Sequence, residues 1–249
     1  MTHDATTSPE PAPLVQRVRH ELKLRELDVA AIDALSPGFV AITFKGEALA
    51  DFTSLGFDDH VKLMFDGAPP EGEVRRDYTP RRFNREAREL VIEFALHGHG
   101  AASNWARTAK PGDRLLVGGP RGSMIVPLEL GWHLLVGDAA ALPAISRRLE
   151  ELPARSRAHV LVLADEADRR AFAGRAEAQV QWPSSGDALL AALRALDLPA
   201  AETGFAWGGG EASLMAQVRQ VLLEKGVPRQ HMRISAYWKQ GVADHHEDL

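Results

Sequence analysis

Short apolar runs separated by turn residues dominate the first half of the chain. Ser36-Pro37-Gly38 and Lys110-Pro111-Gly112 stand between such runs, and proline–glycine pairs mark tight turns. We expect strands at Glu21–Leu27, Phe39–Phe44, His60–Phe65, Leu90–Leu96 and Asp113–Val117. Short strands at this spacing predict a small antiparallel β-barrel.

The pattern changes near Leu128–Gly131, where apolar strands begin to alternate with amphipathic helices. The predicted strands are Trp132–Val136, His159–Ala164, Ala176–Trp182, Gly204–Trp207 and His231–Tyr237. The predicted helices are Ala139–Leu152, Asp187–Leu196 with Asp187 as its cap, and Glu211–Lys225 closed by Gly226. This alternation predicts a parallel sheet covered by helices, with ligands at the carboxyl ends of the strands.

The predicted fold class is therefore all-β plus α/β. It comprises a tail at residues 1–13, a barrel domain at 14–128 and a nucleotide-binding type of α/β domain, with a C-terminal tail, at 129–249. The first tail is polar and proline-rich, so we expect it to be disordered and not a signal peptide. No apolar run is long enough to span a membrane, and we expect a cytoplasmic monomer.

Charge and composition narrow the possible functions. The net charge of −5 argues against nucleic acid as the main partner. The chain has no cysteine, which excludes disulfides, thiolate catalysis and iron–sulfur ligation. Redox chemistry would therefore need a bound organic cofactor. A local cluster of arginines against this acidic average indicates a small anionic ligand.

That cluster lies in the segment Arg75–Phe83. In an extended chain, side chains alternate between faces, so Arg76 and Tyr78 share one face, and Thr79 and Arg81 share the other unless the strand bends. An aromatic ring, a hydroxyl and cations are what a flavin dinucleotide needs from a protein. The alternative is an exposed basic strand with one tyrosine.

A glycine–serine turn follows the strand Leu90–Leu96. Gly100 allows a close approach of the backbone, and Ser103 would cap a short helix that ends at Ala109. The amides of Ala102 and Ser103 would then hold a pyrophosphate at a helix start. An ordinary strand–loop–helix junction is the alternative.

Three further turns carry candidate chemistry. Gly118–Ser123 is not a P-loop, but its Arg121 is available to an anion. Gly137–Pro143 and Gly208–Glu211 join strands to helices where a nicotinamide dinucleotide binds, although neither has the Gly-x-Gly-x-x-Gly fingerprint. Each also fits a plain strand–helix turn. His245 and His246 lie in a charged stretch that favours a solvated tail over a metal site.

Five ordered motifs resemble those of the siderophore-interacting protein family, a bacterial branch of the ferredoxin–NADP reductase-like flavoproteins. The matches cover about residues 14–246. They are Arg76, Tyr78, Thr79 and Arg81; then His97, Gly98, Gly100, Ala102, Ser103, Trp105 and Ala106; then Gly119–Ser123; then Gly137, Asp138 and Ala141–Ile145; and finally Tyr237, Trp238, Lys239 and Gly241.

The resemblance implies non-covalent FAD between a barrel and a nucleotide domain, and reduction of ferric siderophores to release iron. The implied FAD-binding residues are Arg76, Tyr78, Thr79, Arg81, His97, Gly100, Ala102, Ser103, Trp105 and Trp238. The implied nicotinamide-binding residues are Gly137, Asp138, Ala141, Leu142, Gly209 and Glu211. Lys62, Arg121 and Lys239 are candidates for binding the ferric siderophore, and no metal site or certain catalytic residue is expected.

The electron donor stays open at this point. Ala139 and Ala140 stand where the family usually has Glu-Thr, so a ferredoxin is an alternative to NADH or NADPH. Two other functions also remain: a flavin or ferredoxin-type reductase of the same architecture, and a non-catalytic protein that binds a siderophore.

Overall fold

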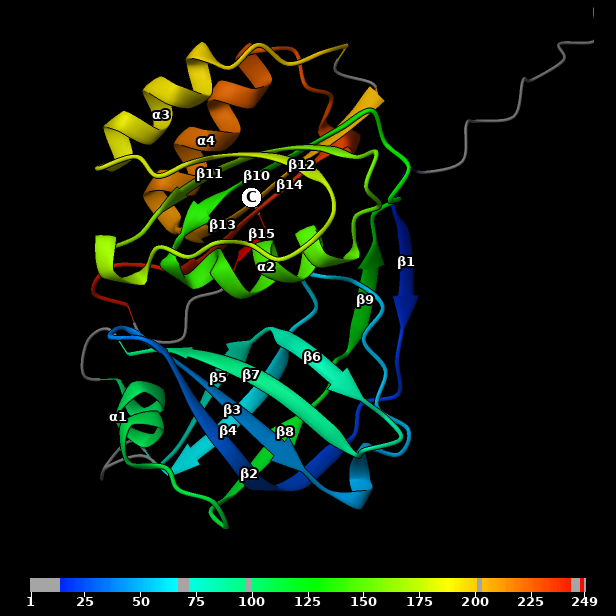
Figure 1. Ribbon diagram of the computed structural model, residues 1–249, viewed down its shortest axis with the longest axis vertical. Helices are drawn as coiled ribbons and strands as arrows, with labels where there is room; N and C mark the ends of the chain where they lie inside the picture. Colours follow the sequence, from blue (N-terminus) through cyan, green and yellow to red (C-terminus); the bar gives the residue numbers. More distant parts are fainter. Residues whose placement is uncertain (1–13, 67–71, 97–99, 201–202, 243–246, 249) are drawn as a thin grey trace, which may run out of the picture.

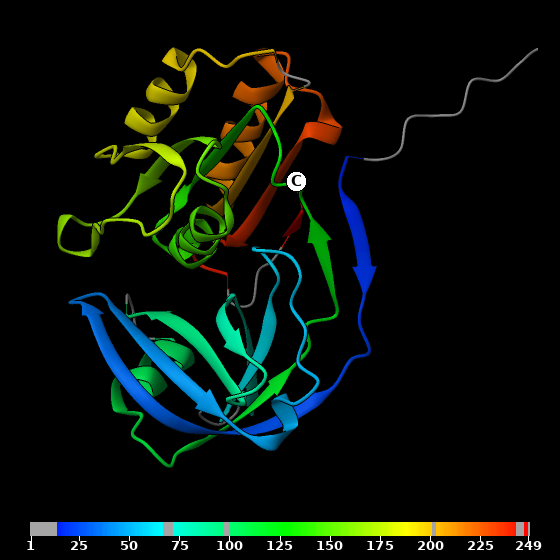
Figure 2. The same ribbon diagram turned by 45° about the vertical axis from the view of Figure 1, so that its right-hand side comes forward.

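The chain forms two stacked units in the computed structural model, which describes residues 14–66, 72–96, 100–200, 203–242 and 247–248. The N-terminal unit is a curved antiparallel sheet, and the C-terminal unit is a sheet covered by helices (Figure 1). A two-stranded ribbon of β1 (Gln16–Arg19) and β9 (Gly122–Ile125) runs alongside both units (Figure 2).

The N-terminal sheet has seven strands in the order β5-β4-β8-β2-β3-β7-β6, all paired antiparallel. Its strands are β2 (Leu24–Ser36), β3 (Phe39–Lys45), β4 (Val61–Asp66), β5 (Glu73–Tyr78), β6 (Pro80–Asn84), β7 (Glu89–Ala95) and β8 (Arg114–Gly118). Among the described residues no ladder joins the edge strands β5 and β6, so the sheet is a half-barrel. The predicted antiparallel barrel is thus confirmed in its open form.

Alternation along the strands fills this half-barrel. On β4, Val61, Leu63 and Phe65 are buried while the residues between them are half-buried. The helix α1 (Ala101–Thr108) covers the same core, and its Trp105 stacks on Phe44 with ring centroids 6.1 Å apart. An aromatic cluster of Phe44, Phe65, Phe94 and Trp105 therefore lies between α1 and the sheet.

The C-terminal sheet has the order β12-β11-β10-β13-β14-β15. Its strands are β10 (Trp132–Asp138), β11 (Arg157–Leu163), β12 (Glu177–Gln181), β13 (Gly204–Glu211), β14 (Met232–Trp238) and β15 (Glu247–Asp248). All pairs are parallel except β14–β15, which makes the sheet mixed. The helix α2 (Leu142–Glu151) lies on the side of the half-barrel, while α3 (Gly186–Ala195) and α4 (Ala212–Glu224) cover the other face (Figure 1).

The two units share a packed interface. Phe39, Phe57 and Val126 come from the N-terminal half but belong to the hydrophobic cluster that includes α2, β10 and β11. Asp168, which follows β11, accepts hydrogen bonds from Ser36 Oγ at 2.7 Å and Gly38 N at 2.8 Å in the β2–β3 turn. Apolar packing and buried hydrogen bonds thus fix one unit against the other.

Predictions about two helix caps and the C-terminal stretch are wrong. Ser103 does not cap α1; Gly100 is the cap residue, and Ser103 Oγ donates to Ala95 O at 3.0 Å from inside the helix. Ser185, and not Asp187, caps α3 by accepting from Ala188 N. The C-terminal stretch is predicted to be a solvated tail, but Glu247 and Asp248 pair with β14. His245 and His246 lie outside the described residues.

None of the helices in the described ranges combines the length and hydropathy that crossing a membrane requires.

Candidate functional site

The register of β4 and β5 places Arg76 and Tyr78 on the same face of the sheet. Leu63 lies opposite Arg76, and Val61 lies opposite Tyr78. Both partners are fully buried, so this face is the one toward the core. The predicted alternation in this segment is therefore confirmed for β5.

The Tyr78 ring is half-buried and lies against the aromatic cluster. Its centroid is 4.6 Å from that of Phe94, with an interplanar angle of 39°. Burial raises the pKa of Tyr78, against the opposing charge of Arg76. The phenol therefore stays protonated at neutral pH, and it presents a flat ring with a hydroxyl donor.

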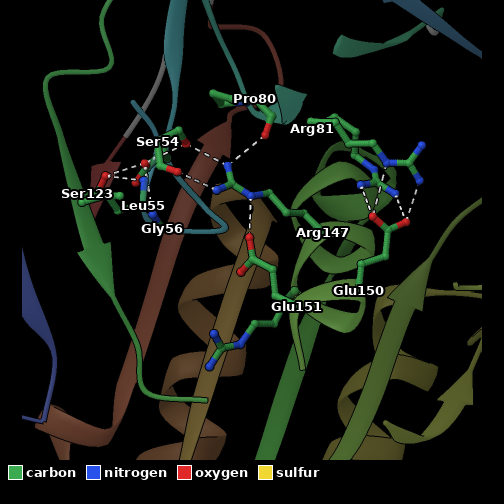
Figure 3. Close-up of polar contacts among 12 residues, drawn as sticks. Ser54, Leu55, Gly56, Pro80, Arg81, Ser123, Arg147, Glu150 and Glu151 are labelled. Carbon is green, nitrogen blue, oxygen red and sulfur yellow. Dashed lines mark hydrogen bonds and ion pairs between the residues drawn. The ribbon is translucent and has the colours of Figure 1, made fainter. Parts of the chain in front are cut away.

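Arg81 lies at the interface between the two units. It is buried on β6, and its Nε donates to Glu93 Oε1 at 3.0 Å. Its two terminal nitrogens donate to both oxygens of Glu150 on α2, at 2.8 and 2.5 Å (Figure 3). Burial opposes ionisation of Glu150, but hydrogen bonds from Arg81 and Arg82 outweigh it and lower its pKa to about 2.

A second arginine, which belongs to α2, reaches the same segment. Arg147 Nη1 donates to Ser54 Oγ at 2.8 Å and to the Pro80 carbonyl at 2.9 Å, and Nη2 donates to the Ser54 carbonyl at 3.0 Å (Figure 3). Thr79, which precedes this proline, is buried. Since α2 begins at the carboxyl edge of β10, this helix connects that edge to the residues around Thr79.

The start of α1 contains the predicted pyrophosphate turn. A side chain added at Gly100 would meet no atom within 4 Å, and Ala102 and Ser103 are buried behind it. Trp105 packs into the aromatic cluster of the half-barrel, with Phe44, Phe65 and Phe94 around it. These contacts indicate that Trp105 is part of the core, and they do not support a direct contact between Trp105 and a ligand. His97 lies outside the described residues.

At the carboxyl edge of the second sheet, the predicted polar residues bind other parts of the protein. Burial raises the pKa of Asp138, whose carboxylate accepts from Ala140 N, Glu211 N and Trp238 Nε1. Glu211 caps α4 by accepting from Ser213 N at 2.7 Å and Leu214 N at 3.1 Å. Burial acts to raise the pKa of Glu211, and hydrogen bonds led by that from Ser213 lower it.

The other predicted nicotinamide residues are tightly packed. Ala141 and Leu142 have no exposed surface, which does not support a contact of their side chains with a ligand. A Cβ on Gly137 would lie 2.4 Å from the Gly209 carbonyl oxygen, and one on Gly209 would lie 3.0 Å from the Tyr237 ring. Close packing of strand ends therefore accounts for both glycines.

The three candidate siderophore residues are not equivalent. Lys62 lies on the outer face of the β4–β5 pair, away from Tyr78, and its Nζ pairs with Asp77 at 3.0 Å. Arg121 is exposed beside the β8–β9 turn, and Lys239 is exposed directly after Trp238. The described residues contain no cluster of three or more His, Asp or Glu side chains that could hold a metal ion.

Sequence reasoning missed the polar residues of the interface. Asp58, in the loop before β4, is buried and accepts from Trp207 Nε1 at 3.0 Å, and it lies 3.1 Å from Arg233 Nε. The sequence pattern indicates Arg147 and Glu150 only as part of an amphipathic helix. The one available signal is their position: charged residues on a helix whose N-terminal half is apolar.

The arrangement of the two units defines the class of protein. The fold superposes on the ferredoxin reductase in carbazole 1,9a-dioxygenase with a TM-score of 0.67, covering 91% of this chain and 70% of that chain at 19% identity. The protein thus has the fold of a ferredoxin reductase, an antiparallel half-barrel followed by a mixed sheet with helices.

Family models then match both units. The siderophore-interacting FAD-binding domain matches residues 28–73 and 68–124, and the siderophore-interacting protein model matches residues 130–241. The NADPH-dependent ferric-chelate reductase of Escherichia coli (strain K12) is 37% identical over 245 residues, 90% of this chain and 96% of that protein. A siderophore utilization protein from T. fusca superposes with a TM-score of 0.86 and 33% identity, covering 93% and 98% of the two chains.

The chain belongs to the siderophore-interacting protein family, which confirms the resemblance predicted from its motifs.

Proposed function

We propose that this protein is an FAD-dependent reductase of ferric siderophores, acting in the cytoplasm as a monomer with NADPH or NADH as electron donor. The observation that carries the proposal is the similarity, across nearly the full length of both chains, to a protein named as an NADPH-dependent ferric-chelate reductase. The second support is the half-barrel, which matches a FAD-binding domain and contains Tyr78 and Gly100, two of the proposed cofactor-binding residues.

The described residues fit FAD at three points. The half-buried ring of Tyr78 offers a flat surface for the isoalloxazine, and Thr79 offers a hydroxyl beside it. Arg76 lies on the same face as Tyr78 and supplies the cation. Gly100 leaves space at the start of α1, where amides of the first turn favour a pyrophosphate.

Arg81 has a different role in this proposal. Its guanidinium already donates to two carboxylates, those of Glu93 and Glu150. We therefore assign Arg76 to the cofactor and Arg81 to the interface between the two units.

Bound FAD would supply the conversion between the two electrons of a nicotinamide hydride and the single electron that reduces Fe(III). The residues of the chain position the cofactor and the substrate, and no acid–base pair is needed for the transfer of an electron. A ferric siderophore binds iron through hard oxygen ligands that hold Fe(II) far less tightly, so reduction releases the metal. Arg121 and Lys239 are exposed and guide an anionic chelate by charge, whereas Asp77 neutralises Lys62.

A protein donor is the second candidate, and specific observations favour it. Asp138 and Glu211 hold amides of the chain at the edge where a nicotinamide dinucleotide is expected, and Ala139 and Ala140 add no polar side chains there. A ferredoxin would deliver electrons without using this edge.

Anaerobic mixing distinguishes these possibilities. The purified protein, loaded with FAD, is mixed with NADPH or NADH, and the flavin absorbance near its visible maximum is followed. We expect bleaching, and recovery when a ferric siderophore is added. No bleaching with either nucleotide, but bleaching with a reduced ferredoxin, would identify a protein donor. A protein that binds a ferric siderophore but no flavin would contradict the proposed reductase.

A further inference from the structure

The carboxylate of Asp138 is where the ends of three parallel strands meet. Asp138 ends β10, and its Oδ1 accepts from Ala140 N at 2.9 Å. Its Oδ2 accepts from the amide of Glu211, at the end of β13, at 2.8 Å. The same oxygen accepts from Nε1 of Trp238, at the end of β14, at 2.9 Å. The residue is only 7% exposed, so its partners come from the protein.

The neighbouring backbone is shaped around this carboxylate. A Cβ on Gly210 would lie 2.6 Å from Asp138 Oδ2, and Gly210 has a φ of 157°. A side chain at this position would displace the acceptor of the Trp238 indole. The glycine in this turn is therefore explained by the need to keep Asp138 in place.

Trp238 combines a fixed edge with an open face. Its indole nitrogen is hydrogen-bonded to a buried carboxylate, yet the residue is 44% exposed. The carboxyl ends of β10, β13 and β14 point toward the half-barrel in both views (Figures 1 and 2). Ligands of such sheets bind at this edge, and an aromatic ring that is ordered in advance loses less freedom when a ligand stacks on it.

We propose that Asp138 is a positioning residue that holds the Trp238 indole as a fixed surface for the planar heteroaromatic ring of a bound dinucleotide. The ring is that of the flavin or that of the nicotinamide, and the two arms of the test below separate them. The identity of the ligand rests on the proposed function, whereas the Asp138–Trp238 hydrogen bond is a property of the protein alone. Asp138 acts through Trp238 and does not contact the ligand.

The hydrogen bond is tested first without a cofactor. The chain has five tryptophans, so ¹⁵N labelling gives five indole N–H signals. Trp238→Phe identifies the Trp238 signal by its loss. We expect this signal to exchange slowly with solvent despite the exposed ring, and to shift and exchange faster in Asp138→Asn. The Trp182 signal, identified by its loss in Trp182→Phe, is the matched control. Trp182 stacks on Phe172, so its signal should not respond to Asp138→Asn.

The positioning role is tested by a double-mutant cycle. The dissociation constant of FAD and the KM and kcat for NADPH are measured for Asp138→Asn, Trp238→Phe and the double variant. Trp238→Phe keeps an aromatic ring but loses the N–H, and we expect roughly tenfold weaker binding of the ligand that stacks there. Asp138→Asn should weaken that ligand in the wild-type background and add little in the Trp238→Phe background. A change in the FAD constant identifies the flavin, and a change in KM alone identifies the nicotinamide.

Three results would overturn the proposal. The first is a Trp238 N–H that is unaffected by Asp138→Asn. The second is an equal loss of affinity from Asp138→Asn in both backgrounds, which would show a role independent of Trp238. The third is wild-type binding of both ligands by Trp238→Phe, which also decides the matter if Asp138→Asn does not fold. If the wild-type protein binds no flavin, the proposed function fails, and the indole signals still report on the hydrogen bond.

Discussion

Gly100→Ala tests whether glycine is needed at this position for a ligand or for the fold. Gly100 has φ −74° and ψ 158°, an extended conformation that any residue adopts. Among the described glycines, it alone has neither a positive φ nor an atom within 4 Å of the position that a Cβ would take. Gly100 is the cap residue of α1, a position where glycine is favoured over alanine, but neither its φ nor its packing requires glycine.

The expected effects on stability and on FAD binding differ in size. Alanine restricts the unfolded chain, which stabilises the fold by about 0.4–1 kcal/mol, but alanine caps a helix less well than glycine, so the free energy of unfolding of the FAD-free protein should change by less than about 1 kcal/mol. The same methyl group would occupy the space at the start of α1 where the pyrophosphate is proposed to lie. Loss of one charge-assisted hydrogen bond costs about 1.5–3 kcal/mol. FAD should therefore bind about tenfold to a hundredfold more weakly, at about 1.4 kcal/mol per decade.

The assay pairs urea unfolding of the FAD-free protein with titration of FAD followed by flavin fluorescence. Gly186→Ala is the matched control, because the first residue of α3 would place its Cβ 3.4 Å from a methyl of Leu214 and is remote from α1 in the fold. It should stabilise the protein without changing FAD affinity. Unchanged FAD affinity in a folded Gly100→Ala protein would refute the proposal that a cofactor approaches Gly100.

Four further substitutions test the interface and a buried histidine. Gly38→Ala would place a Cβ 2.2 Å from Asp168 Oδ2, so we expect a loss of about 1–3 kcal/mol in urea unfolding; an unchanged midpoint would contradict the contact. Arg81→Ala and Glu150→Gln should each lower the free energy of unfolding by roughly 1–3 kcal/mol, while FAD affinity stays unchanged. If Arg81→Ala binds FAD more weakly and Glu150→Gln does not, Arg81 contacts the cofactor and the assignment to the interface is wrong. Burial lowers the pKa of His133 from 6.5 to about 4, so the unfolded chain takes up the proton first and stability falls as the pH drops from 6.5 to 4. His133→Asn should remove up to about 3 kcal/mol of this pH dependence, and parallel pH profiles for the two proteins would refute it.

The half-barrel and most of its strands were predictable because their apolar residues alternate locally. The sequence indicates a strand only at Glu21–Leu27, whereas β2 runs from Leu24 to Ser36. Its second half is rich in alanine, which is a poor strand former on propensity alone, and pairing with β3 overrides that preference. β6 was not separated from β5, because its residues Pro80–Asn84 are mostly polar.

The interface was not predictable in the same way, because its contacts join distant parts of the chain. Arg147 lies 93 residues from Ser54 and 67 from Pro80, so neither partner contributes to the local pattern around α2. The candidate site likewise has a part that the sequence predicts and a part that it does not. Tyr78 and Arg76 followed from alternation within one strand, but the role of Asp138 depends on the ends of three strands meeting.

The shared core has a consequence for how this protein can be divided. Phe39, Phe57 and Val126 lie in the N-terminal half but are at most 4% exposed only because the C-terminal sheet and α2 cover them. A half-barrel expressed alone, ending after Val126, would expose these side chains, and the C-terminal fragment would expose the apolar surface that they cover. The halves are therefore not interchangeable modules, and a chimaera that joins this half-barrel to the sheet of another protein would need a matching apolar surface to stay soluble.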